Sequence, residues 1–176
     1  MEFVDPIYDK ADIPRVKKVL KSMVNGERNL LCFEIGLATA LRPSDLLNLR
    51  VKDVKDGIVR VRAKKTGKAL EIRLNDRVYN MVKSYIQYMG DDDKLFNMDR
   101  TTLYRIMNKA GKMLNLEENL GAHSIRKTKA YHLYIDSGYD ISLVMELLQH
   151  ENAGDTLRYI GWEKKKLAEA VAEHDL

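Results

Sequence analysis

Cysteine is almost absent from this chain of 176 residues, because Cys32 is the only one. A single cysteine excludes an internal disulfide and a thiolate metal cluster. Long apolar runs are missing too, and no stretch approaches the roughly 20 residues that a membrane-spanning helix requires. Residues 1–6 also lack the basic and then apolar pattern of a signal peptide. These absences favour a cytoplasmic location.

Proline, glycine and serine do not cluster anywhere in the chain, so no flexible linker divides it. The sequence has no internal repeat and no low-complexity segment. A single domain covering residues 1–176 is therefore expected, with a C-terminal tail from about residue 163. Charged residues make up 32% of the sequence, which is high but typical of a folded chain. The formal net charge of +4 is only a mild hint of a polyanionic partner.

Apolar residues recur at helical spacing along most of the chain, which predicts an α+β fold that is mostly α-helical. The segment 27–38 is apolar on nearly all sides, so it should form a central buried helix. Asn75 and Asp140 are suited to cap the helices that follow them. Helices are expected over residues 12–24, 27–38, 43–49, 76–89, 100–114, 124–136, 141–148 and 155–159, and in an amphipathic tail that contains Leu167 and Val171.

Two short segments alternate apolar and polar residues, which is typical of β-strands. They are residues 58–62 and 70–74, and the sequence Lys64-Lys65-Thr66-Gly67-Lys68 lies between them. The glycine in this connection favours a turn, so the segments should form one small antiparallel β-hairpin with a basic tip. Exposed lysines in turns usually only improve solubility, so Lys65 by itself indicates no site.

Arg42 follows the apolar helix directly and precedes Pro43, where a new helix is expected to begin. Its guanidinium would lie at the edge of the core and reach either a buried carboxylate or a bound phosphate. Asp45 lies three residues further on, on the same helical face. A structural ion pair between Arg42 and Asp45 is the simplest interpretation of these two residues alone.

His123 and Arg126 lie one turn apart at the expected N-terminus of a helix, where free backbone N–H groups and the helix dipole favour an anion. A capping histidine beside a surface arginine is the alternative. A zinc site is not expected, because this pair lacks a second ligand at metal spacing and the chain has no cysteine pair. His132 and His174 have no companions, so surface or packing positions are predicted for them.

The segment from Leu147 to Tyr159 contains a helix end, a turn and a second short helix. His150 falls at the end of the helix that Asp140 should cap. Gly154 should interrupt the helical pattern, and residues 155 and 156 should restart it before Tyr159. A tyrosine on a short helix beside a histidine is more often a packing residue than a reactive one.

The order of these residues along the chain resembles that of the tyrosine recombinase, or phage integrase, family. The resemblance extends from about Asp12 to Trp162. It rests on motifs in the family's order: Arg42 within Ala-Leu-Arg-Pro-Ser-Asp-Leu, a lysine at a hairpin tip, His123-Ser124-Ile125-Arg126, Leu148-Gln149-His150, and Tyr159 nine residues after His150.

The resemblance implies a catalytic domain that cuts and rejoins DNA through a covalent 3′-phosphotyrosine, without a metal or cofactor. Tyr159 would be the nucleophile, and His123 would assist proton transfer at its phenol. Lys65 would be the general acid that protonates the leaving 5′ oxygen, with Lys64 and Lys68 as neighbours that could serve instead. A phenol with a pKa of about 10 is a poor nucleophile at neutral pH, so a nearby base and cations are required.

The remaining residues of the motif set would bind the scissile phosphate. Arg42 and Arg126 would hold its non-bridging oxygens, His150 would add a hydrogen bond, and Asp45 would support Arg42. Attack on a phosphodiester places negative charge on these oxygens, and preorganised guanidiniums stabilise that charge without a metal.

The chain departs from the larger family members in two respects. They carry an N-terminal core-binding domain that closes over the DNA, whereas too few residues precede the catalytic segment here. The chain is then either a fragment of a longer integrase or a short recombinase that lacks the domain. Many members have glycine where this chain has Ala40 and Gln149, two backbone positions that would not react.

Double-stranded DNA is the partner that the resemblance implies, and no membrane partner is expected. The C-terminal segment of family members packs on the next protomer, so a monomer that assembles into a tetramer on DNA is expected. Accessory DNA-bending proteins are further expected partners. Additional basic side chains would contact phosphates: Lys52, Lys55, Arg60, Arg62, Lys127 and Lys129.

The predicted function is therefore a site-specific recombinase of a phage or other mobile element. A DNA-binding relative that has lost catalysis is a second interpretation, but all six reacting positions are filled. A type IB topoisomerase shares the chemistry and relaxes DNA instead of exchanging strands. The small size and the His-x-x-Arg motif favour the recombinase.

Overall fold

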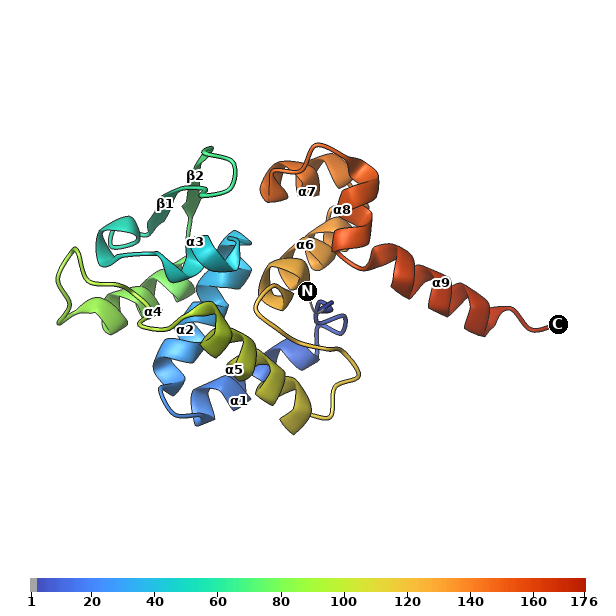
Figure 1. The fold of residues 1–176 in the computed structure, drawn as a ribbon, viewed down its shortest axis with the longest axis horizontal. Helices are drawn as coiled ribbons and strands as arrows, with labels where there is room; N and C mark the ends of the chain where they lie inside the picture. The colour runs from blue at the N-terminus through green and yellow to red at the C-terminus, as the bar shows by residue number, and fades with distance from the viewer. Residues whose placement is uncertain (1–2) are drawn as a thin grey trace.

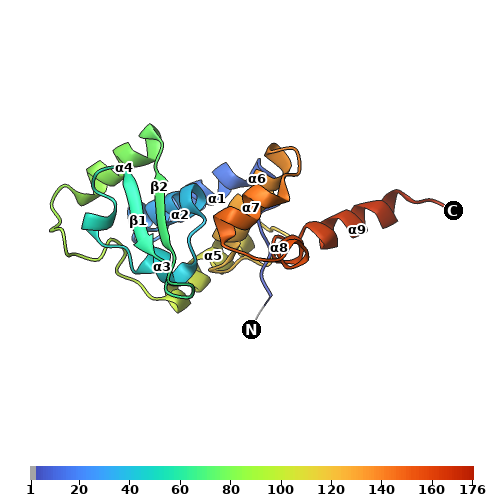
Figure 2. The same ribbon diagram turned by 90° about the horizontal axis from the view of Figure 1, so that it is seen from above.

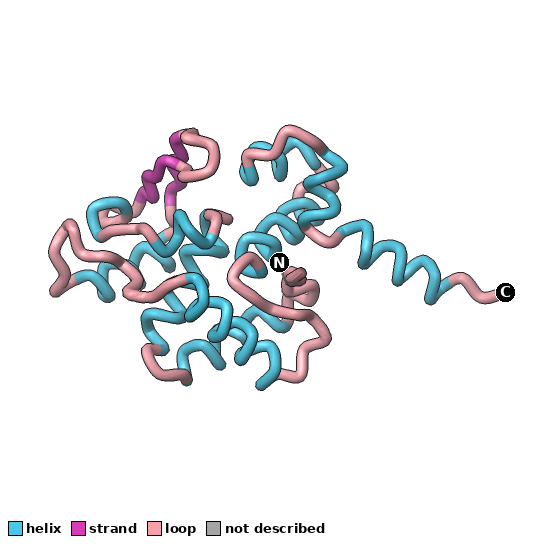
Figure 3. The backbone as a smooth tube through the Cα atoms, viewed as in Figure 1, coloured by secondary structure: helices cyan, strands magenta, loops and turns pink. Residues whose placement is uncertain are grey.

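The computed structural model describes residues 3–176, so the first two residues of the N-terminal segment considered above lie outside it. Helices form most of the fold, with one hairpin beside them (Figures 1 and 3), which confirms the α+β class. Among residues 3–176, none of the helices combines the length and apolar character that a membrane span requires. The elements are α1 (Asp12–Ser22), α2 (Gly26–Thr39), α3 (Pro43–Leu47), the 3-10 helix η1 (Val51–Asp53), β1 (Ile58–Arg62), β2 (Ala69–Arg73), α4 (Asp76–Ile86), α5 (Arg100–Met113), α6 (Ser124–Asp136), α7 (Ile141–Leu148), α8 (Ala153–Tyr159) and α9 (Trp162–Glu173).

Side-chain caps fix the start of several helices as the sequence predicts. Asn75 Oδ1 accepts a hydrogen bond from Val78 N at 2.9 Å, and Asp140 Oδ1 accepts one from Ser142 N at 3.0 Å. Each cap satisfies a backbone N–H group that has no partner within its own helix. The starts of α4 and α7 are therefore encoded locally, by one polar side chain each.

The start of α8 differs from the prediction. The helix begins at Ala153 rather than at residue 155, because Asn152 caps it by accepting a hydrogen bond from Asp155 N at 2.9 Å. Gly154 therefore lies inside the first turn, where backbone N–H groups require no partner within the helix. The helix still ends at Tyr159, which places that side chain in the last turn.

The hairpin is antiparallel, with Ile58 opposite Arg73 and Arg62 opposite Ala69. Gly67 has a φ of +70°, which glycine adopts without steric cost, so it turns the chain at the tip. Residues 64–69 are all exposed. An isolated two-stranded sheet is only marginally stable, so the position of the tip depends on its contacts with the rest of the molecule.

Two hydrophobic clusters hold the helices together. The larger one surrounds α2, whose Phe33 and Ile35 are fully buried, as the apolar segment 27–38 predicts. The smaller one joins α6, α7 and α8 through residues that include Tyr131 and Leu148. Helices α2 and α6 pack against each other, and α6 connects the two clusters because Ile125 belongs to the larger one and Tyr131 to the smaller one.

The N-terminal segment packs against α6 and covers one of the basic residues expected to bind DNA. Ile7 N donates to Thr128 Oγ1 at 2.9 Å, and Lys127 Nζ donates to Val4 O at 2.8 Å. Lys127 is buried, and burial lowers its pKa. A phosphate contact requires Lys127 to lie on the exposed surface, and the structure places it beneath the N-terminal segment instead.

Helix α9 leaves the body of the molecule and points away from it (Figures 1 and 2). None of its residues is buried, and Leu167 and Val171 are each 66% exposed. Its first residue, Trp162, packs edge-on against Tyr134 with ring centres 5.2 Å apart. The amphipathic tail is thus a helix anchored at one end, with apolar side chains that no part of residues 3–176 covers.

A buried carboxylate in α2 makes the stability of the fold depend on pH. Glu34 is 3% exposed, and its oxygens accept hydrogen bonds from Arg77 at 2.7 and 2.8 Å and pair with Lys17 at 3.0 Å. Burial raises the pKa of Glu34, but the hydrogen bonds from Arg77 and Lys17 outweigh it and hold the pKa below its ordinary value. The ionised form therefore favours the folded state.

Glu34→Gln is expected to lower the free energy of unfolding at pH 7 by about 1–3 kcal/mol, because Arg77 and Lys17 lose their charged partner. The folded-state pKa is depressed, so the wild-type advantage is fully present above the ordinary value of 4.5 and is lost as the pH falls through the folded-state pKa. Urea unfolding of both proteins at pH 7 and about pH 3 measures the difference. An equal effect of the substitution at both pH values would contradict this assignment.

Candidate active site

Five of the six residues expected to react come together where the two hydrophobic clusters meet. Arg42 lies at the junction of α2 and α3, and His123 and Arg126 lie at the start of α6. His150 follows α7, and Tyr159 ends α8. The fold thus brings together side chains from four separate parts of the chain.

The backbone between α2 and α3 presents both Arg42 and a carbonyl group to the site. Ala40 ends α2 in the left-handed conformation, with a φ of 53°. A side chain in this region costs about 1–2 kcal/mol, so the turn is maintained by its surroundings. Ala40 O accepts a hydrogen bond from Arg126, and Pro43 begins α3 directly after Arg42.

Two guanidinium groups are held close together by the carbonyl at the C-terminal end of α7. Arg126 is 3% exposed and donates to Ala40 O and Leu148 O, both at 2.6 Å. Arg42 donates to the same Leu148 O and to Gln149 Oε1, both at 3.4 Å. The last carbonyls of a helix carry partial negative charge, so they orient both cations without neutralising them. The arrangement is a positively charged site suited to an anion.

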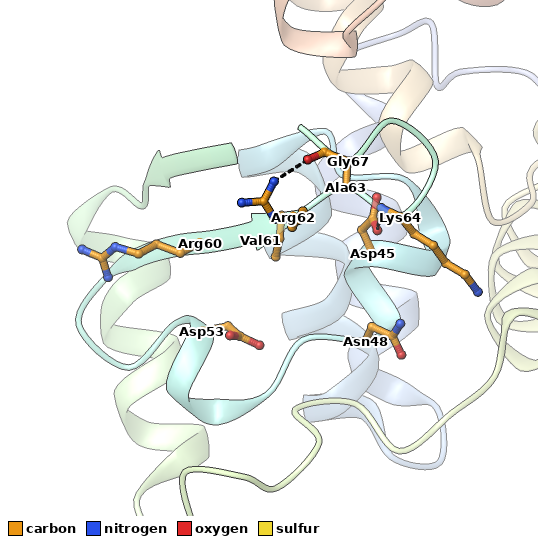
Figure 4. Close-up of a pocket in the computed structure, with 9 residues that line it drawn as sticks. All are labelled: Asp45, Asn48, Asp53, Arg60, Val61, Arg62, Ala63, Lys64 and Gly67. Atoms are coloured by element: carbon orange, nitrogen blue, oxygen red, sulfur yellow. Dashed lines mark hydrogen bonds between the residues drawn. The ribbon is translucent and has the colours of Figure 1, made fainter. Parts of the chain in front are cut away.

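Asp45 does not pair with Arg42, which corrects the simplest interpretation of the sequence. No ion pair joins them within the described part of the chain. Asp45 is 4% exposed, and its Oδ1 accepts a hydrogen bond from Lys64 N at 3.0 Å. Figure 4 shows Asp45 beside Lys64, at the edge of a hollow of about 470 Å³. Asp45 therefore links α3 to the hairpin tip.

The Tyr159 phenol lies among basic and cationic groups. Its Oη is 3.4 Å from His123 Nδ1, and the His150 ring packs edge-on against its ring at 5.2 Å. The Arg126 guanidinium is 5.9 Å from the centre of the ring and the Lys127 ammonium is 4.9 Å from it. Burial raises the pKa of Tyr159, and the nearby guanidiniums only partly oppose this effect. The phenol is therefore protonated at neutral pH and requires a base to attack as a nucleophile.

His123 is placed to accept that proton. Burial, and then the charges of nearby cations that include Arg100 and Lys127, lower its pKa to about 4. The ring is therefore neutral at pH 7, and Nδ1 is an acceptor when Nε2 carries the hydrogen. His123 occupies the N-cap position of α6, but its side chain makes no capping hydrogen bond. The capping interpretation of this histidine is not supported.

NMR titration of the free protein is expected to show the His123 ring neutral down to about pH 4. Because the folded-state pKa lies below the ordinary value of 6.5, the stability from this group is full above pH 6.5 and declines as the pH falls toward about 4. The ring proton shifts give the midpoint, and His123→Asn assigns the signal. A midpoint at 6.5 would contradict the burial of this ring among cations.

His150 is oriented by the turn between α7 and α8. Its Nδ1 lies 3.0 Å from Thr156 Oγ1, and Thr156 donates its own hydroxyl proton to Asn152 O at 2.9 Å. Since that hydroxyl proton is already used, His150 Nδ1 carries a hydrogen. Burial lowers the pKa of His150, and the charges of the two arginines and of Lys65 lower it further.

Lys65 lies at the exposed hairpin tip and forms no hydrogen bond or ion pair with the other five residues in the part of the chain that the structure describes. Of the tip lysines, it is the one whose charge lowers the pKa of His150. The Lys64 side chain extends away from the two strands (Figure 4). It also lines a second hollow, together with Asn48 and Arg100. The geometry therefore favours Lys65 over Lys64 as the lysine that faces the site.

Most of the other basic residues expected to bind phosphate are engaged by protein groups. Arg62 donates to Gly67 O at 2.7 Å, as Figure 4 shows. Three form exposed ion pairs: Lys52 with Asp92 at 2.8 Å, Lys55 with Asp91 at 2.7 Å and Arg60 with Asp56 at 2.6 Å. Exposed ion pairs contribute little stability, and their basic side chains can exchange the carboxylate for a phosphate. The phosphate contacts expected of these residues therefore stay predictions, as does the one expected of the half-buried Lys129. His132, a residue of α6, packs against the N-terminal segment as expected, with Nε2 2.8 Å from Ile7 O.

Sequence reasoning missed the contact between Thr66 and Gln149. Thr66 Oγ1 donates to Gln149 Oε1 at 2.9 Å, which connects the hairpin tip to the end of α7. Gln149 has a φ of 58°, a left-handed conformation that favours glycine. A residue other than glycine at this position indicates that its side chain has a role, but it does not indicate the partner. Thr66 lies 83 residues away, and no local pattern reveals the contact.

Comparison with solved structures shows the class of fold. The crystal structure of XerA recombinase matches with a TM-score of 0.73 and 22% sequence identity, over 100% of this chain and 66% of that one. The catalytic domain of bacteriophage HP1 integrase matches with a TM-score of 0.68 and 24% identity, over 99% of this chain and 97% of that one. The fold is that of a tyrosine recombinase catalytic domain.

Sequence comparison then shows the family. The model of the phage integrase family matches residues 7–166, so the chain belongs to this family of tyrosine recombinases. The probable integrase/recombinase YoeC of Bacillus subtilis is 34% identical over 170 residues, which cover 92% of this chain and 91% of YoeC. The tyrosine recombinase XerA of Saccharolobus solfataricus is 29% identical over 147 residues. This match covers 82% of the chain and 49% of XerA, so the chain spans nearly all of YoeC but about half of XerA.

Proposed function

We propose that this chain is the catalytic unit of a site-specific DNA recombinase, which cleaves and rejoins duplex DNA through a covalent phosphotyrosine at Tyr159. One observation carries the proposal. The Tyr159 phenol lies 3.4 Å from a neutral histidine and beside two guanidiniums that are held by the Leu148 carbonyl. Structures similar to this chain include XerH bound to its difH substrate and a lambda integrase dimer bound to a core site. They support duplex DNA as the partner.

In the cleavage step the Tyr159 oxygen attacks the phosphorus atom and its proton passes to His123 Nδ1. The bond from phosphorus to the 5′ oxygen breaks, and the Lys65 ammonium gives that oxygen a proton. Arg42 and Arg126 stabilise the negative charge on the non-bridging oxygens. The products are a 3′-phosphotyrosine and a free 5′-hydroxyl, and attack of a 5′-hydroxyl in the reverse direction rejoins the strand without ATP.

Phosphate binding would also raise the pKa values of His123 and His150, which suits both side chains to their proposed roles. The charges of Arg42 and Arg126 contribute to the low pKa values of His123 and His150 in the free protein. A phosphate placed between the guanidiniums offsets those charges and raises both pKa values. His123 then becomes a stronger base, and His150 can be protonated and donate a hydrogen bond to the phosphate.

The unpartnered face of α9 supports assembly on DNA. Leu167 and Val171 would pack on a neighbouring protomer, so that a chain that is monomeric alone forms a tetramer on two DNA sites. Residues 1–176 would act as one catalytic domain, and accessory DNA-bending proteins would assist the assembly. The relatives named above include a probable integrase as well as Xer recombinases, and we propose that this chain is the recombinase of a phage or other mobile element.

The test uses a pool of nicked duplexes whose sequence around the nick is random, in buffer with a metal chelator. We expect wild-type protein to form an adduct that resists denaturation, and sequencing of the trapped DNA to reveal a defined site. DNA binding without an adduct would favour the catalytically silent relative. Adducts of random sequence, together with relaxation of any supercoiled plasmid, would favour a type IB topoisomerase.

A further inference from the structure

The general acid proposed above lies between two residues that are both anchored. On one side, Lys64 N donates to the buried carboxylate of Asp45 at 3.0 Å. On the other side, Thr66 Oγ1 donates to Gln149 Oε1 at 2.9 Å. Asp45 belongs to α3, and Gln149 follows α7, so the two anchors come from opposite sides of the site. Figure 1 shows the hairpin tip facing α7.

These anchors matter because little else holds the tip. The loop residues 64–68 are exposed, and the sheet behind them has two strands. The Thr66 hydroxyl is the donor to Gln149, because the amide oxygen that it contacts also accepts a hydrogen bond from Arg42 Nη1 at 3.4 Å and cannot donate. The backbone of Lys65 is thereby fixed from both neighbours, while its own side chain is free to reach outward.

Gln149 occupies a backbone conformation that a glycine would adopt more easily. Its φ of 58° and ψ of 40° are left-handed, and it ends α7. The Gln149 side-chain oxygen accepts two hydrogen bonds, one from Thr66 Oγ1 at 2.9 Å and one from Arg42 Nη1 at 3.4 Å. A strained position whose side chain joins two proposed reacting elements indicates a function rather than a simple helix end.

We propose that Gln149 is a positioning residue that ties the hairpin tip to Arg42, so that Lys65 is held facing the phosphate that Arg42 binds. This inference rests on the proposed function. Asp45 fixes the other side of the same loop. Loss of the Gln149 contact should leave phosphate binding and nucleophilic attack possible but should slow protonation of the leaving oxygen.

A sulfur atom in place of the leaving 5′ oxygen isolates that step. A thiolate is a stable leaving group, because a thiol has a pKa of about 8.5, so it departs without a proton from an acid. A variant that is slow only because Lys65 is absent or misplaced should therefore recover on the sulfur substrate. A variant with disturbed phosphate binding should stay slow on both substrates.

The experiment compares wild-type protein, Lys65→Ala, Gln149→Gly and Thr66→Val on the nicked duplex selected above, with oxygen or sulfur at the scissile position. Gln149→Gly relieves the backbone strain, so its melting temperature should equal or exceed that of the wild type. Thr66→Val removes the hydroxyl donor and leaves Arg42 untouched. Thr66→Ser keeps a hydroxyl at this position, so it should restore activity. Thr101→Val, on the exposed face of α5, is the control for the change from threonine to valine. Amide hydrogen exchange of residues 64–68 in the free proteins is measured in parallel.

We expect Gln149→Gly and Thr66→Val to cleave the oxygen substrate about 10- to 100-fold more slowly, with near wild-type rates on sulfur. Exchange in the tip should be faster in both variants and unchanged in α4. If Lys65→Ala recovers on sulfur and Gln149→Gly is not slowed, or does not recover, the positioning role is wrong and the proposed function stands. If Lys65→Ala does not recover either, the acid role of Lys65 fails, and the positioning role fails with it.

Discussion

Tyr159→Phe is expected to abolish the covalent protein–DNA adduct while leaving DNA binding intact. The substitution removes the oxygen that attacks phosphorus and keeps the ring that packs against His150 and Lys127. The hydroxyl contact with His123 is long, at 3.4 Å, so its loss should change the free energy of unfolding by less than about 1 kcal/mol. Adduct yield on the selected nicked duplex, with DNA affinity measured in parallel, checks this result.

The matched control is Tyr88→Phe, which removes the hydroxyl of a tyrosine that is 92% exposed and lies just after α4. This variant should form adduct at the wild-type rate. Adduct formation by Tyr159→Phe would mean that another side chain attacks the phosphate. Loss of DNA binding in Tyr159→Phe would instead show that the phenol acts in recognition.

Arg126→Ala is expected to lose both activity and stability. The Ala40 and Leu148 carbonyls, which each accept a hydrogen bond from Arg126 at 2.6 Å, would lose that charged donor in a buried place. A buried acceptor left unsatisfied costs about 1–3 kcal/mol, and this applies in full to Ala40 O, whereas Leu148 O keeps its hydrogen bond from Arg42 at 3.4 Å. A total loss of about 2–4 kcal/mol is therefore expected. Adduct formation should fall by about 1,000-fold or more, because phosphate charge loses one of its two guanidiniums.

Arg42→Ala separates these two effects. Arg42 is half-buried and its hydrogen bonds are longer, both at 3.4 Å, so its loss should change stability by less than about 1 kcal/mol. Its adduct rate should still fall by about 100- to 1,000-fold. Urea unfolding and single-turnover adduct formation on both variants measure the contrast. Equal destabilisation by the two substitutions would contradict the assignment of Arg126 as the arginine that also holds the fold together.

Much of the fold follows from local rules, and the sequence therefore predicts it well. Asn75 and Asp140 each cap a helix through a hydrogen bond to a residue two or three positions ahead, a distance that a short pattern reveals. The alternation around Gly67 likewise predicts the hairpin. The pattern predicts the start of α8 two residues too late, because Gly154 indicates a break, whereas the cap at Asn152 already begins the helix.

The arrangement inside the site depends on contacts between distant segments, and these cannot be found from spacing. The family motif places Arg42 and Asp45 three residues apart, but Asp45 is oriented by a backbone N–H of the hairpin. The covering of Lys127 depends on the carbonyl of Val4, which is 123 residues away. The contact of Gln149 with Thr66 is of the same kind. The motif thus identifies the candidate residues, and tertiary structure decides which groups hold them.

The most direct test of the central claim is the chemical identity of the residue that carries the DNA. The adduct formed by wild-type protein on the selected nicked duplex would be digested with nuclease and trypsin and analysed by mass spectrometry. Cleavage after Arg158 and Lys164 gives a peptide of residues 159–164 that contains one tyrosine. The account predicts that this peptide bears a nucleotide through a 3′-phosphodiester on Tyr159. A nucleotide on any other residue, or no adduct from a chain that binds the same DNA, would contradict it.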